Sequence, residues 1–204
     1  MLLPLFLLLL QGAPSGRITN RTIVVASAIR DLNGDGRPDY IAIEMLAPVA
    51  EVGGAPGPFI RGRGRAVVIL AGQAPVSSDL GQLALFPGSW PIVFDDYNAD
   101  GLPDFNIGMM AGSNNFSYSL YTVRSNGKVE PLPIAPPYQL GILIADDSHS
   151  THQIQNDGAG VIRATALDNT LEGPNRGRQV TLQWSGERQR FEVVAVNPPF
   201  ASPE

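Results

Sequence analysis

The stretch Asp31-Leu-Asn-Gly-Asp-Gly-Arg-Pro-Asp39 recurs 65 residues later as Asp96-Tyr-Asn-Ala-Asp-Gly-Leu-Pro-Asp104. Short apolar runs flank both copies and end at Asn, Asp or Gly, which is typical of strands. The flanking runs are 22–29 and 40–43 around the first copy, and 90–94 and 105–108 around the second. The repeat therefore predicts a strand, an acidic loop and a second strand as its unit.

Both loops present oxygen atoms at every second position, which suits calcium because this hard cation takes about six to eight oxygen ligands. Position 7 of each loop contributes its backbone carbonyl. The predicted ligands are Asp31, Asn33, Asp35, the Arg37 carbonyl and Asp39 in the first loop, and Asp96, Asn98, Asp100, the Leu102 carbonyl and Asp104 in the second. Gly36 and Gly101 stand where the chain must turn sharply, so positive φ angles are expected there.

An alternative is that both stretches are Asx turns without a metal. Three carboxylates crowded into each loop would repel one another in the absence of a cation. Two calcium ions would bring the formal charge of the chain from −5 to about −1. The sequence therefore favours two calcium ions as cofactors.

Position 12 separates the known calcium loops. An EF-hand requires an acidic ligand there, and so does a dockerin loop, but this chain has Ala42 and Ile107. With Asp at position 9 followed by a strand, residues 22–44 and 90–108 resemble the FG-GAP or VCBS repeats of β-propeller blades. The resemblance implies an all-β fold of antiparallel, propeller-blade-like sheets. Two clear repeats are too few for a complete ring, so an incomplete or compact β-propeller-like arrangement is expected.

Alternating or apolar runs elsewhere predict further strands. These runs are 66–71, 118–123, 128–132, 151–155, 161–167, 179–184 and 190–195, with hairpin turns at 125–127, 156–158 and 185–186. Residues 79–86 fit a short helix or a strand equally well, and 51–64 reads as a long loop. The predicted organisation is one all-β domain over 16–204, with repeats at 22–89 and 90–135 and a diverged part at 136–204.

Residues 2–10 form an apolar run of signal-peptide length, followed by small residues. The run is too short to span a bilayer. We expect a signal peptide over 1–15, a secreted or periplasmic protein, and no membrane span after cleavage. A buried N-terminal strand is the alternative.

No enzyme signature is present, so we expect a protein that is not an enzyme. The chain lacks cysteine, and the pair His149 and His152 is interpreted as solvated loop residues, with a transition-metal site as the alternative. The net charge of −5 disfavours nucleic-acid binding, which requires a concentrated basic face.

The function expected from these features is a non-catalytic, calcium-stabilised binding scaffold with a protein or glycan partner. Arg61, Arg63 and Arg65, beside Phe59, could bind an anionic partner, or they could lie on a solvated loop. Residues 96–104, with Gly112, Asn115, Tyr118, Leu120 and Tyr121, also resemble periplasmic calcium-binding inhibitors, which are immunity proteins against lysozyme-like effectors. That resemblance implies inhibition as an alternative function, and the FG-GAP resemblance leaves an adhesion or glycan-binding module as another.

Overall fold

The structure is a computed structural model that describes residues 21–51, 59–85, 92–110, 115–139, 142–145, 154–168, 170–172 and 177–197. Over these residues the chain is all-β, with thirteen strands and no helix. No helix able to span a bilayer occurs in this described part of the chain. The predicted all-β class is therefore confirmed.

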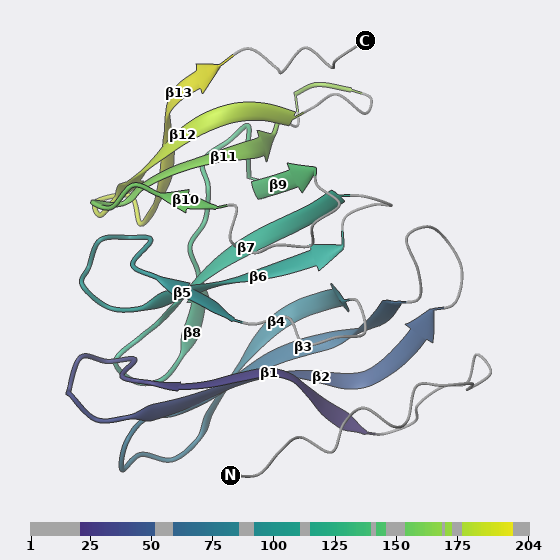
Figure 1. Cartoon of the computed structure of the whole chain (residues 1–204), viewed down its shortest axis with the longest axis vertical. Helices are drawn as coiled ribbons and strands as arrows, with labels where there is room; N and C mark the ends of the chain where they lie inside the picture. Colours follow the sequence, from purple (N-terminus) through teal and green to yellow (C-terminus); the bar gives the residue numbers. More distant parts are fainter. Residues whose placement is uncertain are drawn as a thin grey trace.

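The strands form three antiparallel meanders, which we call blades 1, 2 and 3 (Figure 1). Blade 1 contains β1 (Thr22–Arg30), β2 (Asp39–Glu51), β3 (Phe59–Ile69) and β4 (Val76–Leu85). Blade 2 contains β5 (Val93–Asp95), β6 (Asp104–Met110), β7 (Asn115–Val123) and β8 (Val129–Pro131). Blade 3 contains β10 (Gln155–Asn156), β11 (Val161–Leu167), β12 (Gly177–Ser185) and β13 (Arg190–Asn197).

Strand β9 (Ile142–Ala145) connects blades 2 and 3 into one nine-stranded sheet. It shares one edge of β7 with β8, which pairs with residues 121–123 while β9 pairs with 115–118. On its other side β9 meets β11 at a single register pair, Ile142 and Ala166. Blades 2 and 3 are also connected where the backbone of Phe191 in β13 forms hydrogen bonds of 2.8 Å with Pro133 and Ala135.

The blades stack face to face with blade 2 in the middle (Figure 1), and two hydrophobic cores fill the spaces between them. The first core joins blades 1 and 2 and includes Ile41, Met45 and Leu83 from blade 1 and Phe105 and Val123 from blade 2. The second joins blades 2 and 3. It includes Tyr118, Leu120, Ile162, Leu182 and Phe191.

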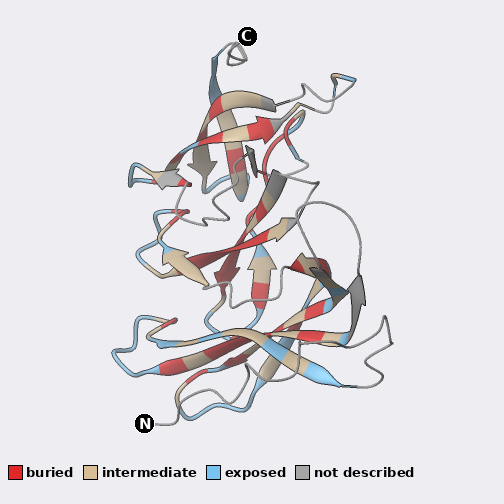
Figure 2. Cartoon of the chain, turned by 45° about the vertical axis from the view of Figure 1, so that its right-hand side comes forward, coloured by how far each residue is buried: buried red, intermediate tan, exposed pale blue. Residues whose placement is uncertain are grey.

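Buried residues follow this layering, since they lie on both faces of blade 2 and mainly along the inner face of each outer blade (Figure 2). In β7, Tyr118 and Leu120 enter the second core, whereas Tyr121 and Val123 enter the first. Opposite orientation of alternate side chains explains how one strand supplies both cores. The described blades stack face to face and do not close into a ring.

The prediction of a long loop over 51–64 is wrong at residue 51 and over 59–64, which are strand residues. Strand β2 continues to Glu51, and β3 already begins at Phe59, while 52–58 lie outside the described residues. Glycine looks like a loop signal, but Gly64 is buried in β3, where a Cβ atom would lie 2.4 Å from Cδ1 of Leu83. Glycine is required there by close packing within a sheet.

Residues 79–85 belong to β4, so the helical interpretation of 79–86 is wrong. Their pairing with β3 replaces the intrahelical hydrogen bonds that a short helix would need. The turn at 125–127 is confirmed, with the Gly127 N–H donating to the Arg124 carbonyl at 2.8 Å. The predicted strand 151–155 is confirmed only at its end, since β10 begins at Gln155 and 151–153 lie outside the described residues.

Candidate metal centre

The two acidic loops occupy equivalent places in adjacent blades. Loop 1, residues 31–38, connects β1 to β2, and loop 2, residues 96–103, connects β5 to β6. Both project from the same side of the molecule, at the left of Figure 1. The turn between β10 and β11 of blade 3 occupies the same place but is shorter and contains one acidic residue, Asp157.

Position 1 of each loop organises the backbone. In loop 1, Asp31 accepts hydrogen bonds from the N–H groups of Gly34 at 2.8 Å and Gly36 at 2.8 Å. In loop 2, Asp96 accepts from Asp100 at 3.1 Å and from Gly101 at 2.9 Å. Such local side-chain bonds fold the nine-residue stretch without help from distant residues.

The glycines at position 6 have the expected conformation. Gly36 has a φ of 78° and Gly101 has a φ of 83°. Glycine adopts this left-handed region at little cost, because it has no Cβ atom to clash with the following carbonyl. This prediction is confirmed in both loops.

Positions 3 and 5 are linked in the same way in both loops. Oδ1 of Asn33 accepts from the Asp35 N–H at 3.0 Å, and Oδ1 of Asn98 accepts from the Asp100 N–H at 2.9 Å. The amide groups of these asparagines donate to the position-5 carboxylates at 3.3 Å and 3.0 Å. The ligands predicted at positions 1, 3 and 5 therefore share one hydrogen-bonded ring in each loop.

Position 7 differs between the loops. The Arg37 guanidinium donates to Oδ2 of Asp35 from Nη2 at 2.7 Å and from Nε at 3.1 Å. This contact lowers the pKa of the Asp35 carboxyl. Loop 2 has Leu102 at the same position, and among the described residues no Lys or Arg forms an ion pair with a loop 2 carboxylate.

Position 9 is buried in both loops but is bonded differently. Asp39 is 2% exposed, and both of its oxygens are occupied, because Oδ2 accepts from Leu32 N–H at 2.9 Å and Oδ1 accepts from Ala71 N–H at 2.7 Å. Asp104 is 0% exposed. Its Oδ2 accepts from the Asn98 N–H at 3.0 Å, whereas its Oδ1 has no hydrogen-bond partner.

The electrostatic environment of Asp104 is unfavourable for a bare carboxylate. The pKa of its carboxyl is raised to about 7, chiefly by burial and in part by the charges of Asp100 and Asp96, while hydrogen bonds from the Thr122 hydroxyl and the Asn98 N–H act in the opposite direction. A buried charge without a partner is costly, so proteins pair it, protonate it or bind it to a cation. Of the two loops, loop 2 would therefore be stabilised more by a bound positive charge.

The described residues contain no group of three or more Asp, Glu or His side chains placed to hold a metal ion by themselves. In each loop the carboxylates of positions 1 and 5 point onto backbone N–H groups of the same loop. Asparagine and carbonyl oxygens would have to complete a coordination shell. Calcium accepts such mixed oxygen ligands readily.

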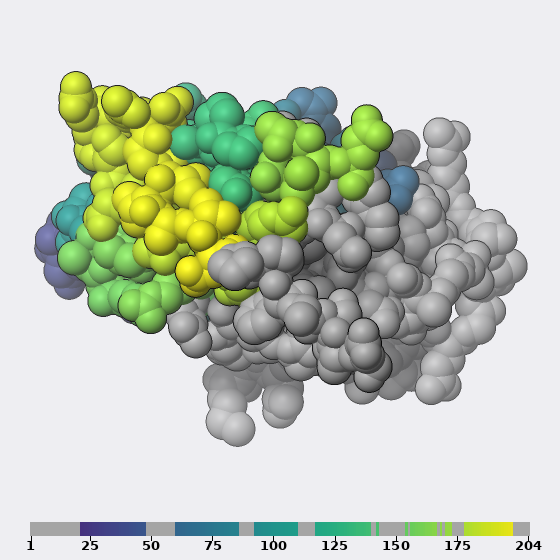
Figure 3. Space-filling view, turned by 90° about the horizontal axis from the view of Figure 1, so that it is seen from above, coloured from purple at the N-terminus to yellow at the C-terminus, as the bar shows by residue number. Residues whose placement is uncertain are grey.

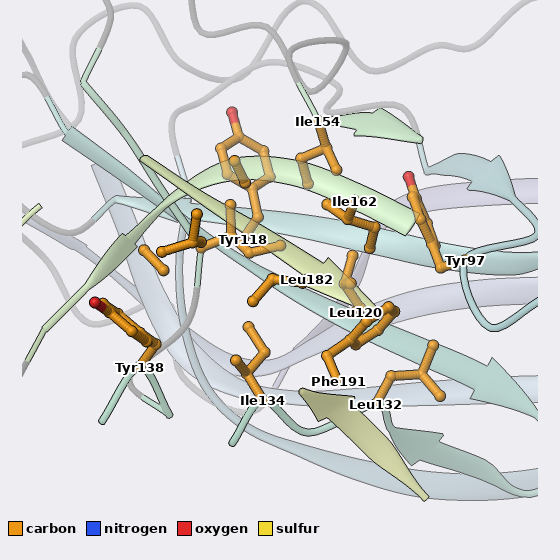
Figure 4. Packing of buried hydrophobic residues seen from close by; sticks show 14 residues of the cluster. Tyr97, Tyr118, Leu120, Leu132, Ile134, Tyr138, Ile154, Ile162, Leu182 and Phe191 are labelled. Carbon is orange, nitrogen blue, oxygen red and sulfur yellow. The ribbon is translucent and has the colours of Figure 1, made fainter. Parts of the chain in front are cut away.

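Sequence reasoning missed the residues that anchor the loops. Position 2 is fully buried in both, with Leu32 in the first core and Tyr97 in the second. The Tyr97 hydroxyl accepts a hydrogen bond of 2.7 Å from Nδ2 of Asn106, whose own Oδ1 is buried without a partner. Figure 4 shows Tyr97 at the edge of the core between blades 2 and 3. The sequence signal for this anchor was a large apolar or aromatic residue between an aspartate and an asparagine.

The predicted arginine cluster lies on a sheet, not on a loop. Arg61, Arg63 and Arg65 alternate along β3 with glycines that face the core, so all three lie on the outer face of blade 1. Arg63 pairs with Asp79 at 2.6 Å and Arg65 with Glu44 at 2.6 Å. The side chain of Phe59 lies outside the described residues.

The same outer face has an apolar end. Ile29, Tyr40 and Ile69 are cross-strand neighbours in β1, β2 and β3, and Ile29 is 74% exposed. Seen from the opposite end of the molecule, blade 3 forms much of the described surface (Figure 3), and Val194 and Val196 of β13 are exposed. His149 and His152 lie outside the described residues.

Comparisons with known proteins found no matching family model and no matching curated protein. Among solved structures, the chain is similar to a structure described as that of a Xanthomonas Type IV Secretion System related protein. The two chains are 13% identical with a TM-score of 0.47, over 82% of this chain and 84% of the other.

Proposed function

We propose that this protein is an exported, non-catalytic, calcium-binding scaffold whose two acidic loops each hold one calcium ion. The observation that carries the proposal is the Asp104 carboxylate, which is 0% exposed, leaves Oδ1 without a partner and is repelled by Asp96 and Asp100. A divalent cation would satisfy the orphaned oxygen and remove the repulsion at once.

The chemistry of the donors favours calcium over transition metals. Every candidate ligand is an oxygen, from carboxylates, an asparagine amide and a backbone carbonyl, and such hard ligands suit calcium or magnesium. Calcium tolerates an irregular shell built from a flexible loop, whereas magnesium requires near-ideal octahedral geometry. In loop 2 the ligands would be Asp96, Asn98, Asp100, the Leu102 carbonyl and Asp104, and in loop 1 the corresponding five residues.

The binding part of the proposal concerns the outer face of blade 1. The arginines at 61, 63 and 65 lie toward one end of this face, with Arg63 paired to Asp79 and Arg65 to Glu44, and the apolar group Ile29, Tyr40 and Ile69 lies at the other end. Guanidinium groups beside exposed apolar and aromatic side chains are common in protein interfaces. A protein partner with acidic groups fits this face better than a glycan, for which stacked exposed aromatic rings would be expected.

Isothermal titration calorimetry of the mature chain with calcium tests the metal-binding proposal. We expect saturable binding, together with a melting temperature that rises by several degrees in calcium relative to chelator, because a ligand that binds only the native state stabilises it. Asp79→Asn is the matched control, since Asp79 is an exposed carboxylate outside both loops. Absence of heat and an unchanged melting curve at millimolar calcium would contradict the proposal.

Binding to a lysozyme-like muramidase tests the partner class, using Arg61→Glu and Ile29→Ser to alter the outer face of blade 1. Loss of binding in both variants, with calcium affinity unchanged, would assign the partner to this face. Equal binding by the variants and the unaltered protein would contradict that assignment, and signals on a glycan array would favour a glycan partner instead.

A further inference from the structure

We infer that the two loops are unequal: loop 2 is a cation-dependent lock between blades 2 and 3, whereas loop 1 is held largely by its own arginine. The inference rests on the proposed function, because it assigns different tasks to the two proposed calcium sites. Three groups of contacts support it: the neutralisation of loop 1, the orphaned oxygen of loop 2, and the attachment of loop 2 to blade 3.

Loop 1 satisfies its charges internally. Arg37 brings a positive charge to within 2.7 Å of Oδ2 of Asp35, where a calcium ion would otherwise bind. Asp39, the second inner carboxylate, accepts backbone N–H groups at both oxygens. A cation entering loop 1 must therefore displace the guanidinium or compete with it, which makes the free energy of cation binding less favourable.

Loop 2 lacks both the arginine and the second backbone hydrogen bond that compensate the carboxylates of loop 1. Leu102 replaces the arginine, and Oδ1 of Asp104 has no partner within a fully buried environment. The acidic cluster alone would not define a site, but an unpartnered buried oxygen next to it is an independent indication of a missing positive ligand. Loop 2 is therefore the site of higher affinity.

Loop 2 is also attached to the next blade. Nδ2 of Asn156, in β10, donates to the backbone carbonyl of Asp96 at 3.0 Å. At Gly160, before β11, an added Cβ atom would lie 3.6 Å from Cβ of Ala99. Tyr97 packs within the core that blade 3 shares with blade 2 (Figure 4).

These contacts couple cation binding to blade 3. A cation held by loop 2 would fix Asp96, and with it the carbonyl that receives Asn156. On its other sides blade 3 is attached through β9, which meets β11 at one register pair, and through Phe191 of β13, whose backbone forms two 2.8 Å hydrogen bonds with Pro133 and Ala135. Loop 1 is bonded within its own blade, where Asp39 accepts from Ala71, and it meets loop 2 where a Cβ atom on Gly34 would lie 3.0 Å from Cδ2 of Leu102. Removal of the cation should therefore loosen blade 3 from its β10–β11 side and leave blade 1 ordered.

A reciprocal exchange at position 7 tests the inference with the full mature chain. Arg37→Leu removes the internal cation of loop 1, and Leu102→Arg introduces one into loop 2. Arg163→Leu is the charge-matched control, because Arg163 is an exposed residue of β11 that pairs with Asp157 at 2.9 Å. Calcium affinity is measured by calorimetry, and the order of each blade by hydrogen exchange in calcium and in chelator.

We expect one tight and one weak site in the unaltered protein. Arg37→Leu should tighten the weak site about tenfold and Leu102→Arg should weaken the tight site about tenfold, as expected for one nearby charge at the protein surface. Chelator should increase exchange in β11 and β12 much more than in β2 and β3. Arg163→Leu should change none of these results.

Two equal sites, unaffected by the exchange, would overturn the inference while leaving calcium binding intact. Equal loosening of blades 1 and 3 in chelator would also overturn it. Absence of calcium binding in every variant would instead overturn the proposed function itself, so the two failures are distinguishable.

Discussion

Oδ2 of Asp104 accepts a 3.0 Å hydrogen bond from the backbone N–H of Asn98, which leaves the other oxygen of this buried carboxylate without a partner. The bond closes loop 2 across six residues and fixes Asp104 at the start of β6. It also confines a negative charge next to Asp96 and Asp100. The first two predictions follow from this confined charge.

Asp104→Asn should have opposite effects with and without calcium. In chelator the variant should be more stable than the unaltered protein by roughly 2–4 kcal/mol near neutral pH, because an amide avoids the burial of an unpaired charge. In calcium the higher stability of the variant should shrink or reverse, because the Asp104 carboxylate is lost as a calcium ligand. Thermal melts in both conditions measure this, with Asp157→Asn as the surface control. A variant that is less stable in chelator would contradict the prediction.

The stability of the calcium-free protein should depend on pH through the same group. The pKa of Asp104 is about 7 in the folded protein against an ordinary value of 3.8, so the folded state holds the proton more strongly. This contribution to stability is complete below pH 3.8 and is lost as pH rises through about 7. Urea titrations in chelator from pH 4 to about 8 should show this decline. Asp104→Asn should remove this decline. A variant whose free energy of unfolding falls equally with pH would count against assigning the decline to Asp104.

Gly64→Ala should destabilise blade 1, because its Cβ atom would lie 2.4 Å from Cδ1 and 2.5 Å from Cγ of Leu83. Overpacking of this kind costs about 1–3 kcal/mol. Gly186→Ala is the control, since nothing lies within 4 Å of a Cβ atom there, and it should change the free energy of unfolding by less than about 0.5 kcal/mol. Equal effects of the two substitutions in urea unfolding would show that close packing does not explain Gly64.

Phe105→Ala should be among the most destabilising single changes in the first core. The Phe105 ring is 0% exposed and stacks on Tyr121 with ring centroids 5.4 Å apart. Loss of a buried aromatic ring costs about 3–5 kcal/mol. Ile29→Ala, on the exposed outer face of blade 1, should cost far less in the same urea titration. A small loss for Phe105→Ala would indicate that blades 1 and 2 do not share the packed core described above.

The local features of the loops could be predicted from the residues alone. Positive φ angles at Gly36 and Gly101, and the strands on either side of each loop, follow from side-chain bonds and turn preferences within nine residues. The spacing also excluded helical calcium motifs, and Ala42 and Ile107 at position 12 are indeed buried strand residues. Ion binding by the ten predicted ligands stays a prediction.

Other features depended on contacts between distant residues. Nothing within 51–64 distinguishes a flexible Gly-Arg loop from a strand, because the deciding partners of Gly62 and Gly64 are Met45 and Leu83. The same applies to 79–85, which are held as a strand by pairing with β3. Local propensity is a weak guide whenever long-range pairing competes with it.

The sequence by itself determined two acidic loops of the same local geometry, because their hydrogen bonds join residues at most a few positions apart. Only the tertiary structure made them different. Stacking blade 3 on blade 2 buried Tyr97, attached Asn156 to loop 2 and left an oxygen of Asp104 without a partner. Desolvation by distant parts of the chain, which no nine-residue motif encodes, therefore decided which loop has the greater need of a cation.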